Sequence, residues 1–337
     1  MATRKPTVLL TNDDGPPGPD SPYIYGLFRH LTRDLGWNVR VVIPSSQKSW
    51  IGKAYQITDV IQGRYYYPKD PDGKGETSES SRPLKDGEVA EWILLDGTPA
   101  TCANIALHNM YPGEIDLLLS GPNLGRNTSG AALSSSLSGT RSIALSYGTV
   151  IHPTPSTWFE PAHSLSMRIV SHLWNNWGED IGGLRNDEVD LYSVNIPMIE
   201  RLLHEEGLQV CWTRMWRNTY GSLFKAHTNP QRAALARTVS IGGPDADTAS
   251  ESPAPWLERS APQTNHADNH LVFKFSPEMK GLITPDDALL PEGSDGWAIM
   301  KGFVSVTPLR ASFAEPLVLG GLAADEAIEN RIWKMKL

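Results

Sequence analysis

The chain has 337 residues, of which 40% are hydrophobic and 20% charged, and its formal net charge is −8. These values are typical of a globular protein with one large domain or two smaller ones, and the acidic balance argues against binding to a nucleic-acid duplex. Only Cys102 and Cys211 are present, which excludes a disulfide framework and a cysteine-based zinc site.

No apolar stretch approaches the roughly 18 residues of a membrane span, and the N-terminal residues do not have the pattern of a signal peptide. We therefore expect a cytoplasmic protein that does not bind membranes.

The first predicted element is a short buried strand at Val8 to Leu10, which ends at the run Asn12-Asp13-Asp14-Gly15. Two adjacent carboxylates repel each other and lose hydration when buried, so they need a compensating cation. Oxygen ligands favour a hard cation such as Mg²⁺, Mn²⁺ or Ca²⁺ over zinc. The alternative is an exposed Asp-Asp-Gly turn that is capped by Asn12.

A helix and a second strand follow this loop. Asp20-Ser21-Pro22 predicts a helix N-terminus, apolar residues then recur at helical spacing up to Leu35, and Gly36 ends the helix. A strand at residues 39–43, ended by Pro44, completes a βαβ unit.

The same alternation continues to about residue 196. We interpret residues 63–88, which are polar and rich in turn residues, as a surface insertion. Alternating strands and helices predict an α/β fold with a Rossmann-like three-layer core, in which a mostly parallel sheet carries helices on both faces. The predicted strands lie at 92–95, 115–119, 143–145 and 191–196, and the predicted helices at 99–110 and 161–177.

The periodic pattern weakens in the C-terminal third. We expect the α/β core to span residues 1–225 and a C-terminal, β-rich extension to span 226–337. Within the extension, residues 245–269 have the composition of a disordered loop. Alternating apolar residues from Trp297 to Thr307 predict a late strand or one arm of a β-hairpin.

Several predicted strands end in polar loops at what should be one edge of the sheet. The first strand brings Asp13 and Asp14, the second is followed by a loop with Lys48 and Ser49, and a third is followed by Asn123. Open α/β sheets bind ligands at the carboxyl ends of their strands. The sequence therefore predicts that Asp13, Asp14 and Asn123 surround one cation.

Five segments, in this order, resemble those of a known family: Asn12-Asp13-Asp14-Gly15, the loop with Ser49, Gly97-Thr98-Pro99, Ser120-Gly121-Pro122-Asn123, and Val304 to Leu309. Together they resemble the SurE survival-protein family of metal-dependent nucleotidases and acid phosphatases, particularly its eukaryotic, fungal-type branch. The resemblance spans about residues 6–225 and 295–320.

The resemblance implies a divalent cation, Mg²⁺ or Mn²⁺, bound by Asp13, Asp14, Ser49 and Asn123. It also implies catalytic roles for Asp13, Asp14 and Asn12, with Asn12 beside the ion. The expected reaction is hydrolysis of a phosphate monoester, such as a nucleoside monophosphate, by cation-assisted attack of water. Whether an aspartate also acts as base or nucleophile stays open.

Substrate contacts are expected from Lys48 and Asn127, and from Ser135 and Ser136 as the remnant of a phosphate-binding segment. The family's pattern has a Ser-Gly-Thr segment that opens a long helix after the asparagine loop, and in this chain the segment from Ser129 to Ile143 is shorter. The family usually assembles as dimers or tetramers, so we expect a homodimer or homotetramer.

Two alternative functions can be set against the hydrolase. The shortened segment favours a catalytically impaired relative that binds a metal or a nucleotide without turnover. A dinucleotide-dependent oxidoreductase is disfavoured because no G-x-G-x-x-G run follows the first strand.

Overall fold

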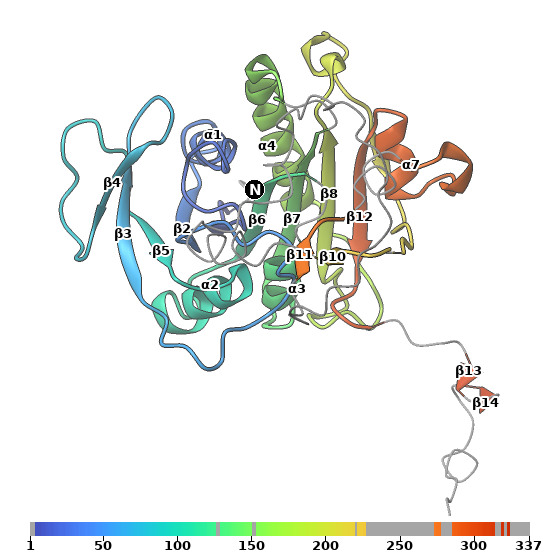
Figure 1. Ribbon diagram of the computed structural model, residues 1–337, viewed down its shortest axis with the longest axis horizontal. Coiled ribbons are helices and arrows are strands. Elements are labelled where there is room, and N and C mark those ends of the chain that lie inside the picture. The colour runs from blue at the N-terminus through green and yellow to red at the C-terminus, as the bar shows by residue number, and fades with distance from the viewer. Residues whose placement is uncertain are drawn as a thin grey trace, which may run out of the picture.

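The computed structural model describes residues 4–125, 129–149, 153–219, 221–226, 273–277, 285–313, 318–319 and 322–323. A ten-stranded sheet with the order β4-β3-β5-β2-β1-β6-β7-β8-β12-β9 forms the centre of the molecule (Figure 1). Its strands are β1 (Thr7–Thr11), β2 (Asn38–Pro44), β3 (Gly63–Pro68), β4 (Gly75–Ser78), β5 (Trp92–Leu95), β6 (Leu117–Leu124), β7 (Arg141–Gly148), β8 (Leu191–Pro197), β9 (Val210–Trp212) and β12 (Val304–Leu309).

The strands at the centre of the sheet, from β5 through β2, β1, β6 and β7 to β8, all run parallel. Antiparallel strands extend both edges: β3 pairs with β5, and β12 pairs with β8. In the register of the central pair, Leu9 lies opposite Leu118 and Thr11 opposite Ser120. The carboxyl ends of β1 and β6 therefore meet at the same edge of the sheet.

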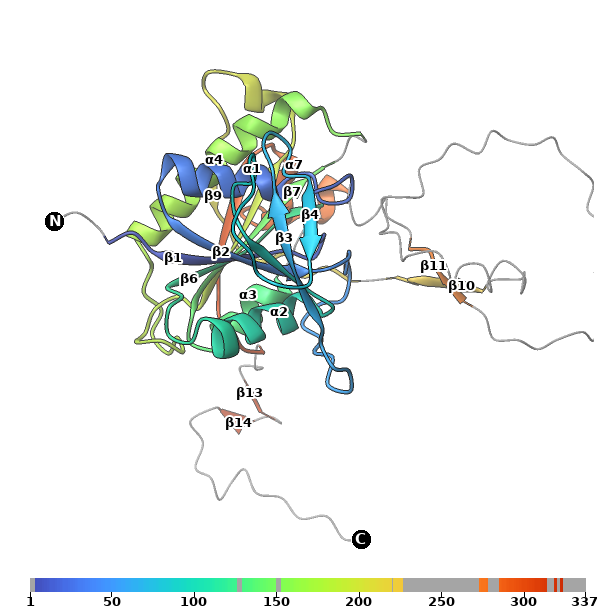
Figure 2. The ribbon, with the colours of Figure 1, turned by 90° about the vertical axis from the view of Figure 1, so that its left-hand side faces the viewer.

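Helices cover both faces of the sheet, and Figure 2 shows the resulting three layers, with α1 and α4 on one side and α2 and α3 on the other. The α-helices are α1 (Ile24–Arg29), α2 (Pro99–Ile105), α3 (Gly130–Ser136), α4 (Phe159–Asn175) and α7 (Asp295–Met300). Two π-helical turns, η1 (His30–Asp34) and η2 (Ala106–Met110), continue α1 and α2, and short 3-10 turns lie at η3 (Ser156–Trp158), η4 (Glu200–Leu203) and η6 (Asp287–Leu289).

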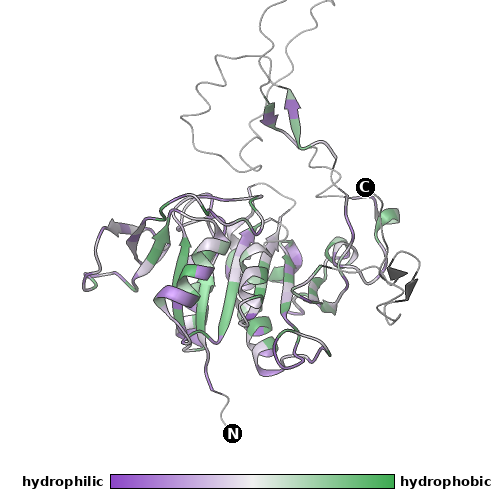
Figure 3. Ribbon diagram, turned by 90° about the horizontal axis from the view of Figure 1, so that it is seen from below, coloured by the Kyte–Doolittle hydropathy of each residue, from purple (hydrophilic) through white to green (hydrophobic). Residues whose placement is uncertain are grey.

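Each face of the sheet has its own hydrophobic core. Val8 and Leu10 of β1 pack in the core beneath α1 and α4, whereas Leu9 packs in the core beneath α2 and α3. This alternation follows from the two-residue period of a strand. The central strands are correspondingly hydrophobic, as Figure 3 shows. The predicted mostly parallel sheet with helices on both faces is confirmed.

The interpretation of residues 63–88 as an insertion needs correction. Residues 63–68 and 75–78 form the hairpin β3–β4, which adds two strands to the edge of the sheet. Tyr66 and Tyr67 are buried there, and the run of three tyrosines from Tyr65 has the high strand propensity that the polar composition hid.

The expected strand from Trp297 to Thr307 is also wrong in its first half. Residues Asp295–Met300 form α7, and the Ser294 side chain caps this helix by accepting a hydrogen bond from the Trp297 N–H at 3.2 Å. Only Val304–Leu309 is a strand, β12, which pairs with β8 of the core.

Two further strand pairs lie outside the large sheet. They are the antiparallel pairs β10 (Phe224–Ala226) with β11 (Phe273–Phe275), and β13 (Val318–Leu319) with β14 (Leu322–Ala323). The loop predicted at 245–269 lies outside the described residues, and the division into a core and an extension stays a prediction. Among the residues that the structure describes, no helix is both long and apolar enough to cross a membrane.

Candidate active site

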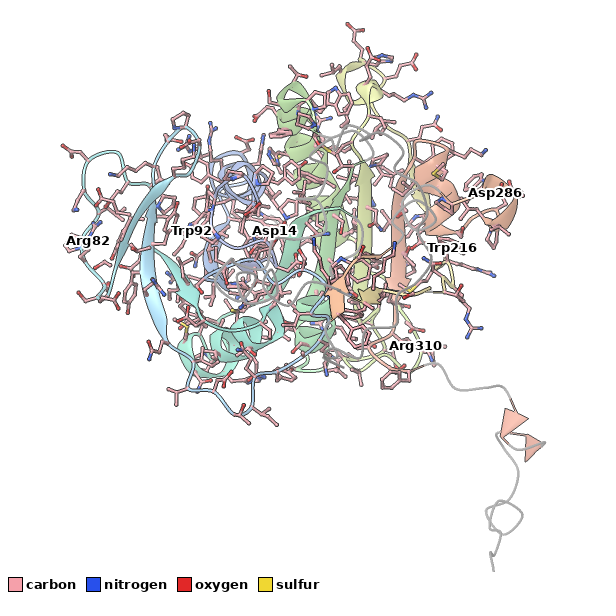
Figure 4. The ribbon with its side chains drawn as sticks, viewed as in Figure 1. Asp14, Arg82, Trp92, Trp216, Asp286 and Arg310 are labelled. Carbon is pink, nitrogen blue, oxygen red and sulfur yellow. The ribbon has the colours of Figure 1, made fainter. Side chains whose placement is uncertain are left out.

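The polar run after β1 is buried. Asn12, Asp13 and Asp14 are 0%, 8% and 4% exposed, so the alternative of an exposed turn is wrong. Figure 4 shows Asp14 near the middle of the sheet, between Trp92 on one side and Trp216 on the other. Two neighbouring carboxylates held out of water are costly unless positive charge or hydrogen-bond donors surround them.

Asn12 shapes the loop that carries the two aspartates. Its Nδ2 donates hydrogen bonds to the Gly15 carbonyl at 2.8 Å and to Ser21 Oγ at 3.0 Å, and its Oδ1 accepts one from the Gly15 N–H at 3.1 Å. These three hydrogen bonds give Asn12 a positioning role in the loop, and its predicted catalytic role stays a prediction.

Ser21 completes this network, a role that sequence reasoning missed. Its hydroxyl donates to the Gly15 carbonyl at 2.8 Å, and α1 begins only at Ile24, after Tyr23, without a side-chain cap. The predicted N-cap at residues 20–22 is therefore wrong, because the Ser21 hydroxyl serves the Asp13–Asp14 loop. No local sequence signal distinguishes this use from capping.

The end of β6 contributes the second part of the site. The Leu124 N–H donates a 3.0 Å hydrogen bond to Asp14 Oδ2, which ties the end of β1 to the main chain beside Asn123. The register of β6 against β7 shifts between Ser120 and Asn123, and Asn123 is 7% exposed. Asp14 is thus bonded to the main chain next to Asn123, and the Asn123 side chain as a metal ligand stays a prediction.

The loop after β2 lies against the same edge. The Lys48 N–H donates to the Asp13 carbonyl at 2.7 Å. Gly15 has a φ of +85°, and a Cβ there would lie 3.3 Å from the Ser46 carbonyl carbon, so only glycine fits this close approach of the two loops. The contact brings Lys48 and Ser49, both half-buried, next to the Asp13 main chain.

This set of donors fits a hard divalent cation. Two carboxylates, one amide and one hydroxyl offer oxygen ligands only, as Mg²⁺ and Mn²⁺ prefer. Among the described residues, no group of three or more His, Cys, Asp or Glu side chains could hold a metal ion. A cation bound by Asp13 and Asp14 therefore needs neutral oxygens, and Ser49 and Asn123 are the ones that the sequence predicts as ligands.

Two hydroxyls that the sequence predicts to contact substrate lie at the C-terminal end of α3. The Ser136 hydroxyl donates to the carbonyls of Ala132 and Asp190, both at 3.0 Å, and Asp190 precedes β8 at the opposite edge of the sheet. Ser135, one residue earlier, is fully buried. Ser135 and Ser136 end this seven-residue helix, about 7.5–9 Å along its axis from Gly130, and their contact with substrate stays a prediction. Asn127 lies outside the described residues.

The beginning of α3 does contact the loop after β2. A Cβ on Gly130 would lie 2.3 Å from the Gly52 carbonyl oxygen, and the Ser134 hydroxyl is hydrogen-bonded to the Tyr55 hydroxyl. The predicted start of α2 is confirmed, since the Thr98 side chain accepts a hydrogen bond from the Thr101 N–H at 3.1 Å.

Comparison with known proteins identifies the family. The model of the family described as "Survival protein SurE" matches residues 8–222, which include every candidate metal ligand. The chain belongs to the SurE family.

Two curated relatives and one solved structure illustrate the range of similarity. The probable tubulin–tyrosine ligase PBY1 of Saccharomyces cerevisiae is 31% identical over 91% of this chain, and the chain spans only 41% of that protein's length. The 5'-nucleotidase SurE of Prochlorococcus marinus is 27% identical over 79% of this chain and 92% of its own. The SurE protein from Aquifex aeolicus has the same fold, with a TM-score of 0.54 at 22% identity, covering 92% of this chain and 95% of its own.

Proposed function

We propose that this SurE protein is a divalent-metal-dependent phosphomonoesterase that hydrolyses nucleoside monophosphates or related phosphate monoesters. The observation that carries the proposal is the burial of Asp13 and Asp14 at the end of β1, with Asp14 bonded to the main chain beside Asn123. The 5'-nucleotidase names of relatives such as the Prochlorococcus protein support this class of reaction.

Asp13 and Asp14 would hold Mg²⁺ or Mn²⁺, with Ser49 and Asn123 as neutral ligands. When bound, such an ion polarises a phosphoryl oxygen and lowers the pKa of a bound water molecule. The two carboxylates balance a divalent charge, and the neutral ligands add no further negative charge to repel the phosphate dianion of the substrate.

The remaining residues orient these groups. The hydrogen bonds among Asn12, Gly15 and Ser21 fix the loop, so the two carboxylates need little reorganisation when substrate binds. Lys48 supplies a positive charge at the same edge, which an acidic protein needs in order to attract a phosphate.

A second candidate function is binding of metal or nucleotide without turnover. The observation that favours it is the short α3, whose Ser136 hydroxyl is engaged at the opposite edge of the sheet. Helix N-termini often hold phosphates, and a helix of seven residues offers less of that stabilisation than a long one.

The test is release of p-nitrophenol from p-nitrophenyl phosphate with Mg²⁺, Mn²⁺ or EDTA. We expect metal-dependent release that Asp13→Asn abolishes, while Asp20→Asn, an exposed aspartate beside the same loop, serves as the matched control. Metal-dependent thermal stabilisation without release would favour the second function. Full activity in the Asp13 variant would refute the assignment of the site.

The homodimer or homotetramer expected from the sequence stays a prediction, which light scattering on the purified protein tests.

A further inference from the structure

Aromatic side chains gather beside the candidate site. The Trp50 ring lies 5.4 Å from the Phe275 ring, centroid to centroid, and Phe275 lies 5.5 Å from Phe224, both in edge-to-face geometry. Trp50, Phe224 and Phe273 are 43%, 56% and 59% exposed. We call these four residues, Trp50, Phe224, Phe273 and Phe275, the aromatic wall.

Three of these rings share one face of the β10–β11 pair. Phe224 lies opposite Phe275 and Ala226 opposite Phe273, whereas Lys225 and Lys274, between them, point to the other face. Figures 2 and 3 both show this pair standing off the main body, and in Figure 2 it lies beyond the carboxyl ends of the central strands. The aromatic face therefore meets the loop after β2 at the edge where Asp13 and Asp14 lie.

Trp50 is held in an unfavourable backbone conformation. Its φ is +66°, in the left-handed region that bulky side chains rarely adopt. Strained residues of this kind persist where the surrounding contacts hold them, and they cluster at ligand sites. Trp50 directly follows Ser49, a candidate metal ligand. The residue that precedes Ser49 is Lys48, whose main-chain N–H donates a hydrogen bond to the Asp13 carbonyl.

We propose that Trp50 and Phe275 form a nucleobase-binding subsite, so that the aromatic wall gives the enzyme its preference for nucleoside monophosphates over small alkyl phosphates. The proposal rests on the phosphatase function proposed above, since the phosphate would occupy the edge beside Asp13 and Asp14. Every nucleobase has a π-face, and aromatic side chains bind such faces with little sequence preference.

Charge near the wall favours a phosphorylated ligand. Lys48 and Lys53 lie on the loop after β2, which also carries Trp50. This local positive charge stands in a chain with a net charge of −8, and it is where an anionic substrate is most strongly attracted. An aromatic surface with lysines around it matches a nucleotide better than an apolar peptide.

The experiment compares Trp50→Gly and Phe275→Ala with Phe313→Ala, an aromatic residue that is 98% exposed beyond the other edge of the sheet. Trp50→Gly removes the ring and also relieves the positive φ, so loss of folding is not expected from strain. Trp50→Phe keeps a ring. The readout is the ratio of kcat/KM for AMP to kcat/KM for glycerol phosphate, which has no aromatic group.

We expect this ratio to fall about tenfold in Trp50→Gly and Phe275→Ala, to be largely restored in Trp50→Phe, and to stay at the wild-type value in Phe313→Ala. Equilibrium dialysis with adenosine, which carries no phosphate, separates this proposal from the phosphatase function. Adenosine binding that weakens in the first two variants supports the subsite even if no substrate is hydrolysed.

Three results would overturn the subsite. The first is that the two variants leave both the kcat/KM ratio and adenosine binding unchanged, and the second is that the wild-type protein does not bind adenosine. The third is that kcat/KM falls equally for both substrates and the oligomeric state changes on a sizing column. The last result would show that the aromatic wall is a contact between subunits.

Discussion

His163 should make the free energy of unfolding of this protein depend on pH between about pH 7 and 4.5. The side chain lies in α4, is 3% exposed, and shares a 2.9 Å hydrogen bond with the Tyr147 hydroxyl. The His163 ring also packs closely against Gly26 of α1, since a Cβ added to Gly26 would lie 2.2 Å from the His163 Nε2. Burial, and to a lesser degree the nearby His30 and Arg29, lower the pKa of His163 from 6.5 to about 3.

The sign follows from this lowered pKa. Below pH 6.5 the His163 imidazole is protonated in the unfolded chain but stays neutral in the folded protein. The contribution of His163 to the free energy of unfolding is therefore complete above pH 6.5 and is lost as the pH falls toward 3. At about 1.36 kcal/mol per pH unit, acidification from pH 7 to about 4.5 should lower the free energy of unfolding by roughly 2.7 kcal/mol. Carboxyl groups with lowered pKa values, such as that of Asp70, act in the same direction, but mainly at still lower pH.

The measurement is urea unfolding, followed by tryptophan fluorescence, at several pH values for the wild-type protein and for His163→Gln. Glutamine does not titrate and can still hydrogen-bond to the Tyr147 hydroxyl. The variant should be less stable at neutral pH but should lack the roughly 2.7 kcal/mol decline. Parallel curves for the two proteins between pH 7 and 4.5 would refute the reasoning, because they would show that the His163 pKa hardly changes on folding.

Three further predictions concern single residues. Gly121→Ala should lower the free energy of unfolding by more than about 3 kcal/mol and give little soluble protein, because Gly121 has a φ of +126° and a Cβ would lie 2.0 Å from a carbonyl oxygen of β7. A melting temperature equal to that of the wild-type protein would contradict this prediction. Burial raises the pKa of the Cys102 thiol to about 12, so a thiol reagent should modify only the half-buried Cys211 in the native protein, as mass spectrometry of labelled peptides can check. Arg82 holds the pKa of Glu88 at about 2, so the stabilisation of the fold by this ion pair should persist down to about pH 4.5 and disappear toward pH 2. Equal acid unfolding of the wild-type protein and Glu88→Gln would argue against this prediction.

The sequence predicted the parts of the site that are local to a strand and its end. Asp13 and Asp14 follow an apolar run, and Asn123 follows another, so parallel pairing alone places them at one edge. What could not be predicted depends on contacts between distant loops. Ser21 looks like a helix cap in the sequence, and only the folded loop shows that its hydroxyl bonds to Gly15.

The errors in the fold have a similar origin. The β3–β4 hairpin was interpreted as an insertion because its polar composition outweighed the run of tyrosines that pairs with β5. Residues 295–307 contain a helix of six residues and a strand, and a window that short gives no reliable period. In both cases tertiary pairing, not local propensity, decides the structure.

The proposed metal site and the proposed phosphate site lie on different parts of this fold, so an experiment can separate the two candidate functions. The candidate metal ligands Asp13 and Asp14 follow the end of β1, and Asn123 lies in β6. The Leu124 N–H holds the Asp14 carboxylate and the Lys48 N–H holds the Asp13 carbonyl, and neither bond involves α3. A phosphate cradle built on α3 depends instead on a helix of seven residues. If the proposed function holds, the short helix would weaken the hold on the transferred phosphoryl group without removing the ion, and a nucleobase held by Trp50 and Phe275 is the contact that would offset the loss. Nucleoside monophosphates should then retain turnover where glycerol phosphate does not.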